Sequence, residues 1–246
     1  MSGKVVVVGL GEIGKPLLDL ITERFEAVGV DIDPVEVNGG CEILHICFPF
    51  EIEDFVGVSV QYIEKYRPSL TVINSTVAPG TSRRIYSLTG KPIAHSPVRG
   101  KHVKMREDIL HYTKFIGGID EQASQKASEH FSKIGLKTTI LSSPEATELA
   151  KLTETTYFGL LIMWAQEVER YCTQFGLDYD EVVSFYDEIH FFPPVGYFPG
   201  VIGGHCVMPN VKILKGVLKS DILNAIEKSN EMKAKNIGID GWQSEK

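Results

Sequence analysis

The stretch KVVVVGLGEIGKPLLDLI, residues 4–21, decides the fold. It begins with an unbroken run of valines, which is typical of a strand buried on both faces of a parallel sheet. Three glycines follow at the spacing G-x-G-x-x-G, namely Gly9, Gly11 and Gly14. An amphipathic helical pattern comes next, so the glycines fall in the turn between a strand and a helix. This order predicts the first unit of a Rossmann-like, dinucleotide-binding domain.

Each glycine has a separate physical role in such a turn. Gly9 permits the tight turn, Gly11 lets a pyrophosphate approach the backbone at the helix N-terminus, and Gly14 lets helix and strand pack closely. A second strand pattern, FEAVGVDID, delivers Asp31 about 20 residues after the first glycine. A carboxylate there accepts hydrogen bonds from the ribose hydroxyls and repels a 2'-phosphate. The expected cofactor is therefore NAD rather than NADP.

Two further apolar runs, EILHICFPF and LTVINST, are typical of buried parallel strands. Their ends face the ligand crevice in open α/β sheets. The predicted cofactor-binding residues are thus Gly9, Gly11, Glu12, Ile13, Gly14, Asp31, Pro49, Ser75 and Thr76. Only about nine residues, DPVEVNGGC, separate the second and third strands, near the minimum for a parallel crossover. We therefore expect an abbreviated sheet that has lost an edge strand.

The second half of the chain has helical periodicity. Ser143, followed by Pro144 and Glu145, predicts a helix start, and the pattern continues without a break to about Gln174. The expected fold is α/β, with an NAD-binding Rossmann-like domain over residues 1–142. An all-α domain over residues 143–246 follows, and its long helix is expected to form a homodimer.

Composition limits the classes of function. The chain has 246 residues, 43% of them hydrophobic, and a formal net charge of −7, which argues against general binding of nucleic acid or of a membrane surface. No signal peptide and no membrane span is visible in the pattern. The four cysteines lack metal-site spacing, so we expect reduced thiols, no metal and a cytoplasmic protein.

The segment FPGVIGGHCVMPN, residues 198–210, places Cys206 after a glycine pair in a loop flanked by prolines. The residues alone leave three readings: a nucleophile, a metal ligand or a small apolar filler. A basic run begins at Arg99, and it is either a solvated loop or a clamp for a phosphate or carboxylate of the substrate.

Taken together, the motifs resemble the UDP-glucose/GDP-mannose dehydrogenase family, especially its UDP-N-acetylmannosamine branch. The resemblance rests on VVGLGEIG, HICFPF, INSTVAPGT, HSPVRG, KFIGG, ELAKLTETTY, QEVE and PGVIGGHCVMPN, and it covers nearly the whole chain. Family members oxidise a sugar primary alcohol to a carboxylate in two NAD-dependent hydride transfers. The resemblance implies that a cysteine forms a thiohemiacetal and then a thioester.

By this resemblance, Cys206 is the nucleophile, Lys151 stabilises the oxyanion, and Thr76 lies near the reacting water and nicotinamide. The substrate, a nucleotide sugar or related polar alcohol, is expected to contact Arg99, Gly203, Gly204 and His205, of which His205 orients the loop.

The chain also departs from the family pattern. The family's asparagine is Thr155 here, its aspartate is Asn210, and the glutamate of its SPE motif is Val98. Thr155 can still donate one hydrogen bond, so it and Asn210 stay among the predicted catalytic residues. The chain is also expected to lack the family's C-terminal nucleotide-binding domain. Two alternatives remain open: a two-electron β-hydroxyacid-type dehydrogenase that uses Lys151, and a dinucleotide-binding protein without turnover.

Overall fold

The computed structural model describes residues 4–31, 35, 37, 40–100, 104–188, 198–204 and 206–238. It divides into two compact units, unit 1 over residues 1–151 and unit 2 over residues 152–246. The long helix predicted from Ser143 onward begins in unit 1 and continues into unit 2. It is observed as α6 (Pro144–Phe175), with the amide of Ala146 donating to the Ser143 hydroxyl at 3.3 Å.

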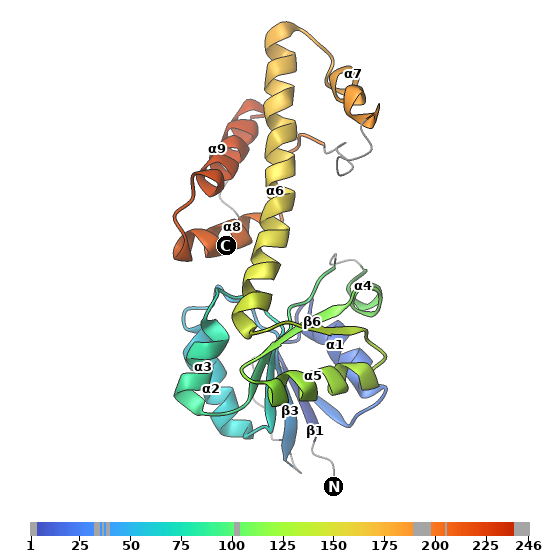
Figure 1. The fold of residues 1–246 in the computed structure, drawn as a ribbon, viewed down its shortest axis with the longest axis vertical. Coiled ribbons are helices and arrows are strands. Elements are labelled where there is room, and N and C mark those ends of the chain that lie inside the picture. The colour runs from blue at the N-terminus through green and yellow to red at the C-terminus, as the bar shows by residue number, and fades with distance from the viewer. Residues whose placement is uncertain are drawn as a thin grey trace. The chain divides into compact units, whose positions relative to one another are not determined.

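Unit 1 alternates strands and helices, as the apolar runs predicted (Figure 1). Before α6 its elements are, in chain order, β1 (Lys4–Val8), α1 (Gly14–Thr22), β2 (Ala27–Val30), β3 (Cys41–Ile46), α2 (Phe55–Tyr66), β4 (Leu70–Ile73), α3 (Thr81–Thr89), β5 (Ile93–His95), α4 (Met105–His111), β6 (Lys114–Gly118), α5 (Glu121–Lys133) and β7 (Thr138–Ile140).

The strands form a seven-stranded sheet in the order β2-β1-β3-β4-β5-β6-β7. The expected loss of an edge strand is confirmed, because β2 is the edge of the sheet and the described residues between β2 and β3 form no strand. One pairing departs from an all-parallel sheet: β5 and β6 are antiparallel, with His95 opposite Gly117. The chain leaves β5, forms α4 and enters β6 from the same edge. The first residue of β6 therefore lies at the carboxyl edge of the parallel strands.

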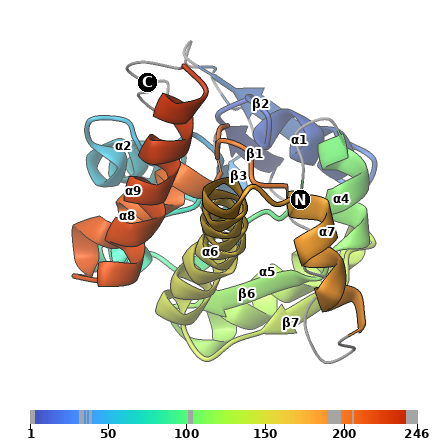
Figure 2. The ribbon, with the colours of Figure 1, turned by 90° about the horizontal axis from the view of Figure 1, so that it is seen from above.

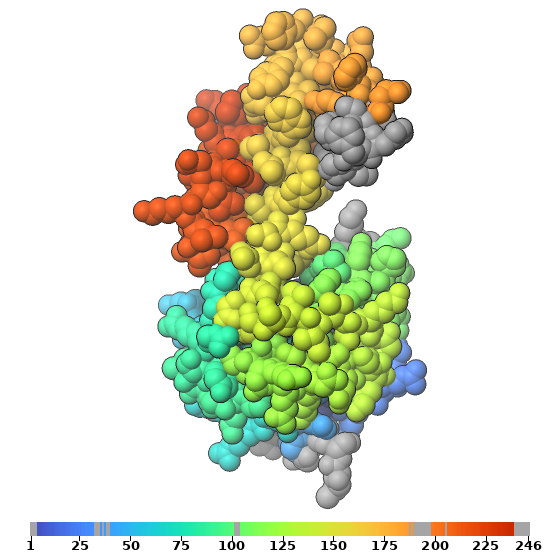
Figure 3. Space-filling model, viewed as in Figure 1, coloured from blue at the N-terminus to red at the C-terminus, as the bar shows by residue number. Residues whose placement is uncertain are grey.

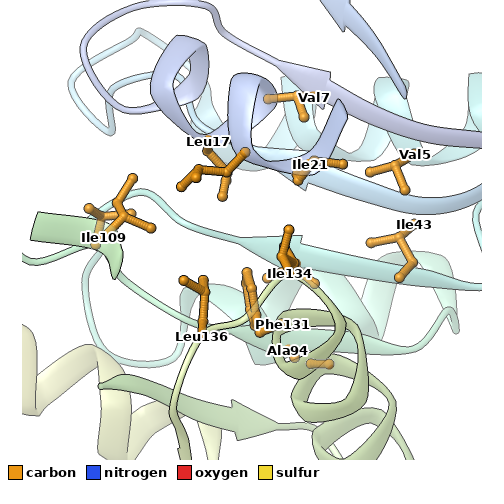
Figure 4. Packing of buried hydrophobic residues seen from close by; sticks show 14 of the residues in the cluster. Val5, Val7, Leu17, Ile21, Ile43, Ala94, Ile109, Phe131, Ile134 and Leu136 are labelled. Atoms are coloured by element: carbon orange, nitrogen blue, oxygen red, sulfur yellow. The ribbon is translucent and has the colours of Figure 1, made fainter. Parts of the chain in front are cut away.

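Helices cover both faces of this sheet (Figure 2). Alternate residues of β1 point to opposite faces, so Val5 and Val7 pack with α1, α4 and α5, whereas Val6 and Val8 pack with α2 and α3. Figure 4 shows the first of these cores, where Leu17 of α1 faces the side of the sheet on which Phe131 of α5 lies. A sheet buried on both faces explains the unbroken valine run.

Unit 2 is helical. After α6 it contains α7 (Tyr179–Ser184), the 3-10 helix η2 (Phe185–Glu188), α8 (Val207–Val217) and α9 (Asp221–Asn236). Its core joins Leu152 of α6 to apolar residues of α8 and α9, and Figure 3 shows α9 packed along α6. Of the described helices, none is long and apolar enough to cross a membrane.

Candidate functional site

The glycine turn after β1 has the geometry that each glycine was expected to provide. Gly9 adopts φ +87°, a conformation that side chains disfavour. A Cβ on Gly14 would lie 1.8 Å from the Gly9 carbonyl oxygen, so only glycine lets α1 start this close to the strand. A Cβ on Gly11 would meet nothing within 4 Å. The backbone at Gly11 is thus open to a ligand, which fits the pyrophosphate of a dinucleotide.

The N-terminus of α1 supports the same fit. Its N-cap residue is Ile13, and no side chain caps the first turn, whereas Asp54 caps α2 and Asp120 caps α5. Pro16 has no N–H and the Lys15 amide donates to the Gly11 carbonyl at 3.1 Å, so the Gly14 amide is the first-turn donor left to attract an anion. Asp31 follows the neighbouring strand β2 and is exposed. The turn and this carboxylate lie at one edge of the sheet, where a dinucleotide would span them.

The remaining predicted cofactor residues follow β3 and β4 at the same edge. Pro49 is exposed and Thr76 is half-buried. Ser75 is buried, and its hydroxyl donates to the Phe48 carbonyl at 2.6 Å. Ser75 therefore connects the two segments that follow β3 and β4, and its hydrogen bond helps to hold this edge of the sheet.

The buried histidine His95 makes a second connection next to Thr76. His95 Nε2 lies 3.1 Å from the Ser75 carbonyl oxygen and Nδ1 lies 2.8 Å from the Thr147 hydroxyl. Because a carbonyl only accepts, Nε2 carries the proton and the Thr147 hydroxyl donates to Nδ1. Burial lowers the pKa of His95 to about 3, so the ring is neutral. It joins α6 to the end of β4.

Helix α6 also reaches the loop beyond Thr76 through Glu148. This fully buried carboxylate accepts the amide of Gly80 at 2.7 Å and the amide of Ser82 at 2.9 Å, at the start of α3. Burial raises its pKa, although these hydrogen bonds oppose the shift. Lys151 lies one helical turn further on and is half-buried. Glu148 thus positions, within unit 1, the helix that carries the predicted catalytic lysine.

Beneath the same edge runs a chain of buried polar side chains that the sequence analysis did not identify. Lys114 Nζ approaches Asn74 Oδ1 at 3.5 Å, and Asn74 Nδ2 donates to His45 Nδ1 at 3.1 Å. His45 Nε2 must then carry the ring proton, which it donates to His130 Nε2 at 3.0 Å. His130 Nδ1 is buried, and no hydrogen-bond partner for it occurs among the described residues. The polar residues in the apolar runs LHICF and TKFIGG were the available signal.

Arg99 begins the basic run predicted to bind substrate. Its guanidinium lies 5.2 Å from the ring centre of Tyr112 and 5.0 Å from that of Phe115, and it donates to the Thr113 carbonyl at 3.1 Å. The side chain is therefore fixed in place by its neighbours. Val98 is buried in the core on the α1 and α5 side of the sheet, so it offers no polar group to a site.

The cysteine loop belongs to unit 2. Of the four free cysteines, Cys206 is exposed and the other three are buried, which removes the filler reading for Cys206. Cys206 is the N-cap residue of α8, a position where the helix dipole favours negative charge. Gly159 of α6 makes room for this end of α8, because a Cβ there would lie 2.7 Å from Val207 Cγ1.

Three buried polar residues anchor the segment before Cys206, and the sequence analysis missed them too. Asn230 accepts the Ile202 amide at 2.7 Å and donates to the Ile202 carbonyl at 3.1 Å. Gln166 donates to the Gly200 carbonyl at 2.7 Å and accepts from Ser229 at 2.8 Å. Polar side chains on the apolar faces of α6 and α9 were the signal. They fix the approach to the glycine pair.

The other predicted residues of unit 2 are placed as follows. Gly203 and Gly204 are exposed, and Gly204 has φ +74°. Asn210 was expected in the loop but lies inside α8. It is buried there, and its backbone N–H donates to the Cys206 carbonyl at 3.3 Å. Thr155 lies on α6, one turn beyond Lys151, and is half-buried. His205 lies outside the described residues.

The predicted site residues thus fall into two groups. The cofactor residues, Thr76, Lys151 and Arg99 belong to unit 1, while Cys206 and its loop belong to unit 2. That Cys206 faces Lys151 and Thr76 stays a prediction. Among the described residues, no group of three or more His, Cys, Asp or Glu side chains is arranged to hold a metal ion.

A glycine turn between β1 and α1, on a mostly parallel sheet followed by a helical unit, defines a Rossmann-like fold of the dinucleotide-binding type. Residues 145–232 match the model of the central domain of the UDP-glucose/GDP-mannose dehydrogenase family. The chain is related to this family, as its motifs predicted.

Curated relatives bear dehydrogenase names. The chain is 27% identical over 256 residues to UDP-N-acetyl-D-mannosamine dehydrogenase of Methanococcus maripaludis, covering 83% of this chain and 59% of that one. It is 26% identical to NDP-N-acetyl-D-galactosaminuronic acid dehydrogenase of Ralstonia solanacearum, covering 82% of this chain and 62% of that one. The chain thus spans less than two thirds of the length of these relatives.

Solved structures show the same fold. The UDP-D-ManNAc dehydrogenase of Pyrococcus horikoshii superposes with a TM-score of 0.83 at 20% identity, covering 95% of this chain and 69% of that one. The 3-hydroxyisobutyrate dehydrogenase of Mycobacterium tuberculosis superposes with a TM-score of 0.72 at 13% identity, covering 96% of this chain and 94% of that one.

Proposed function

We propose that the protein is an NAD-dependent dehydrogenase that oxidises a primary alcohol of a nucleotide sugar to the carboxylate. The observation that carries the proposal is the glycine turn, in which Gly9 and Gly14 fit only as glycines and Gly11 opens the backbone to a pyrophosphate. NAD would lie along this edge, with Asp31 beside its ribose hydroxyls, and would accept the hydrides. The kinship with nucleotide-sugar dehydrogenases supports the substrate class.

In this mechanism the alcohol loses a proton and a hydride to give an aldehyde. The Cys206 thiolate then adds to the aldehyde carbon and forms a thiohemiacetal, whose oxyanion the Lys151 ammonium stabilises. A second hydride leaves to give a thioester, and water, held near the Thr76 hydroxyl, hydrolyses it to the carboxylate. Two hydride acceptors are reduced for each alcohol oxidised. The exposed position of Cys206 at the start of α8 supports its role as the nucleophile.

Turnover with a panel of UDP-sugars tests the proposal. We expect two NADH per substrate in the wild type and no acid in Cys206→Ser, because serine lacks the nucleophilicity of a thiolate. Cys172→Ser, at a buried cysteine of the same unit, is the matched control and should keep the stoichiometry. Binding of NADH without formation of NADH on any substrate would refute turnover and favour a dinucleotide-binding protein. The buried Val98, which replaces the family's glutamate, already favours that alternative.

A two-electron β-hydroxyacid dehydrogenase is the second candidate, because this chain covers nearly all of the 3-hydroxyisobutyrate dehydrogenase fold. It would use Lys151 and not Cys206. One NADH per substrate, unchanged in Cys206→Ser and lost in Lys151→Met, would select it.

We also propose that two copies of the chain pair through α6. Tyr157, Trp164 and Tyr171 recur every seven residues, on one side of the helix, and each is about half exposed. Such an exposed aromatic row is typical of a partner surface. Light scattering should report a dimer for the wild type and a monomer for Trp164→Lys; a monomeric wild type would refute the pairing. We place the protein in the cytoplasm, where its cysteines stay reduced.

A further inference from the structure

The residue that stands apart in unit 1 is Lys114, at the start of β6. It is only 3% exposed, although lysine is almost never buried without an ionic partner. Its ammonium donates to the carbonyl oxygens of Ser96 at 2.6 Å and Pro97 at 3.2 Å, and approaches Asn74 Oδ1 at 3.5 Å. It also lies 4.9 Å from the ring centre of Phe131. Each of these partners, all among the described residues, is a neutral group.

No described carboxylate is among the groups that perturb Lys114. Burial lowers the pKa of Lys114 to about 7. Three titratable groups also act on it: Lys151 and Arg99 lower its pKa further, and Cys47, itself a neutral thiol because burial raises its pKa, opposes the shift. The rings of His45 and His95 also face it, and both stay neutral because burial lowers their pKa values. A buried cation without an anionic partner costs folding free energy, so an apolar side chain would suit the core better.

The hydrogen-bond acceptors of Lys114 indicate what the buried cation contributes in return for its cost in folding free energy. Asn74 follows β4 and directly precedes Ser75 and Thr76, while Ser96 and Pro97 follow β5 and lead to Arg99. Since β6 runs antiparallel to β5, its first residue reaches the carboxyl edge where the glycine turn also lies. One ammonium group therefore holds two segments that carry predicted cofactor and substrate residues.

We propose that Lys114 is a positioning residue, whose buried ammonium group holds the ends of β4 and β5 in the arrangement that binds the dinucleotide. Charge-assisted hydrogen bonds are about twice as strong as neutral ones, so the protonated lysine holds these carbonyls best. Loss of its proton weakens them and loosens the edge. The inference rests on the proposed dinucleotide binding, and it adds a residue on which that binding depends.

NADH binding, measured by calorimetry alongside urea unfolding, tests the inference. Lys114→Met should weaken NADH binding at pH 6.5 at least tenfold while the protein stays at least as stable as the wild type. Lys114→Arg keeps the charge and donors and cannot lose its proton, so it should retain tighter binding than Lys114→Met. The wild type should lose affinity as pH rises from 6 to 8.5, whereas Lys114→Arg should not.

Lys91→Met, which removes the same charge from an exposed position of unit 1, is the matched control and should bind as the wild type does. Equal NADH affinity of the wild type and Lys114→Met across this pH range would overturn the inference and leave the proposed function standing. A wild type that binds no NADH would overturn the proposed function itself. Weaker binding that tracks a loss of stability in Lys114→Met would show a merely structural lysine, and would also overturn the inference.

Discussion

Replacing Lys114 by methionine should remove a pH dependence from the stability of the protein. Lysine in the unfolded chain has a pKa of 10.5, whereas burial lowers the pKa of Lys114 in the fold to about 7. Between these values the unfolded state binds more protons than the folded state, so the free energy of unfolding rises with pH. The rise begins near pH 7, where the folded-state lysine is half deprotonated.

The size of the effect follows from these two pKa values. One proton of difference is worth about 1.4 kcal/mol per pH unit, and the difference grows from about half a proton at pH 7 to nearly one at pH 8.5. The wild type should therefore gain about 1.5 kcal/mol relative to Lys114→Met over this interval. Buried Cys47, whose pKa is raised to about 12, ionises in the unfolded chain of both proteins, so its contribution cancels in the difference between them.

Urea unfolding followed by circular dichroism at pH 7.0, 7.5, 8.0 and 8.5 measures this difference. Lys91→Met should keep the wild-type slope, because it removes a lysine from an exposed position of unit 1 and leaves buried Lys114 in place. A wild type and a Lys114→Met variant whose stabilities run parallel from pH 7 to 8.5 would refute the reasoning, and so would a wild type that loses stability relative to the variant.

Four further variants, one of them with its own control, test the geometry within each unit. Gly14→Ala should cost about 3 kcal/mol of stability, because its Cβ would overlap the Gly9 carbonyl. Gly11→Ala should cost less than about 1 kcal/mol of stability, yet it should weaken NADH binding tenfold. Urea unfolding measures the loss of stability, and calorimetry measures the loss of NADH binding. Glu148→Gln should cost about 1–2 kcal/mol, because an amide satisfies only one of the amides of Gly80 and Ser82. Its control, Glu145→Gln, breaks a partly exposed ion pair with Arg83 and should cost less than about 1 kcal/mol by the same unfolding assay. Asn230→Leu should leave the Ile202 amide and carbonyl unpaired and cost about 3 kcal/mol; hydrogen exchange at Ile202 should speed up, and unchanged exchange would show that the loop is held elsewhere.

Local signals allowed much of the fold to be predicted. The valine run, the glycine spacing and the start of α6 at Pro144 each depend on residues close together in sequence, whose conformational preferences act locally. The short segment before Cys41 predicted the lost edge strand for the same reason, since chain length limits a crossover.

Long-range pairing explains what the sequence did not reveal. The antiparallel entry of β6 depends on how the chain crosses the sheet edge, and no residue of TKFIGG encodes the direction of its neighbour. Asn210 was read by its place in a loop motif, yet the helix begins at Val207. Lys114 meets Asn74, and Glu148 meets Gly80, across separations that no periodic pattern reports.

The hydrogen bonds from Lys114 through Asn74 and His45 to His130 all run in one direction. This affects which residue an inflection in a pH profile of the protein is assigned to. Every donor in this chain points away from the lysine, and while Lys114 is protonated its ammonium cannot accept a hydrogen bond, so the Asn74 amide cannot flip. His45 and His130 are locked as neutral tautomers, and burial lowers the pKa of His130 to about 4. Among the buried groups described in unit 1, Lys114 is therefore the one expected to give an inflection near pH 7, which is customarily assigned to a histidine.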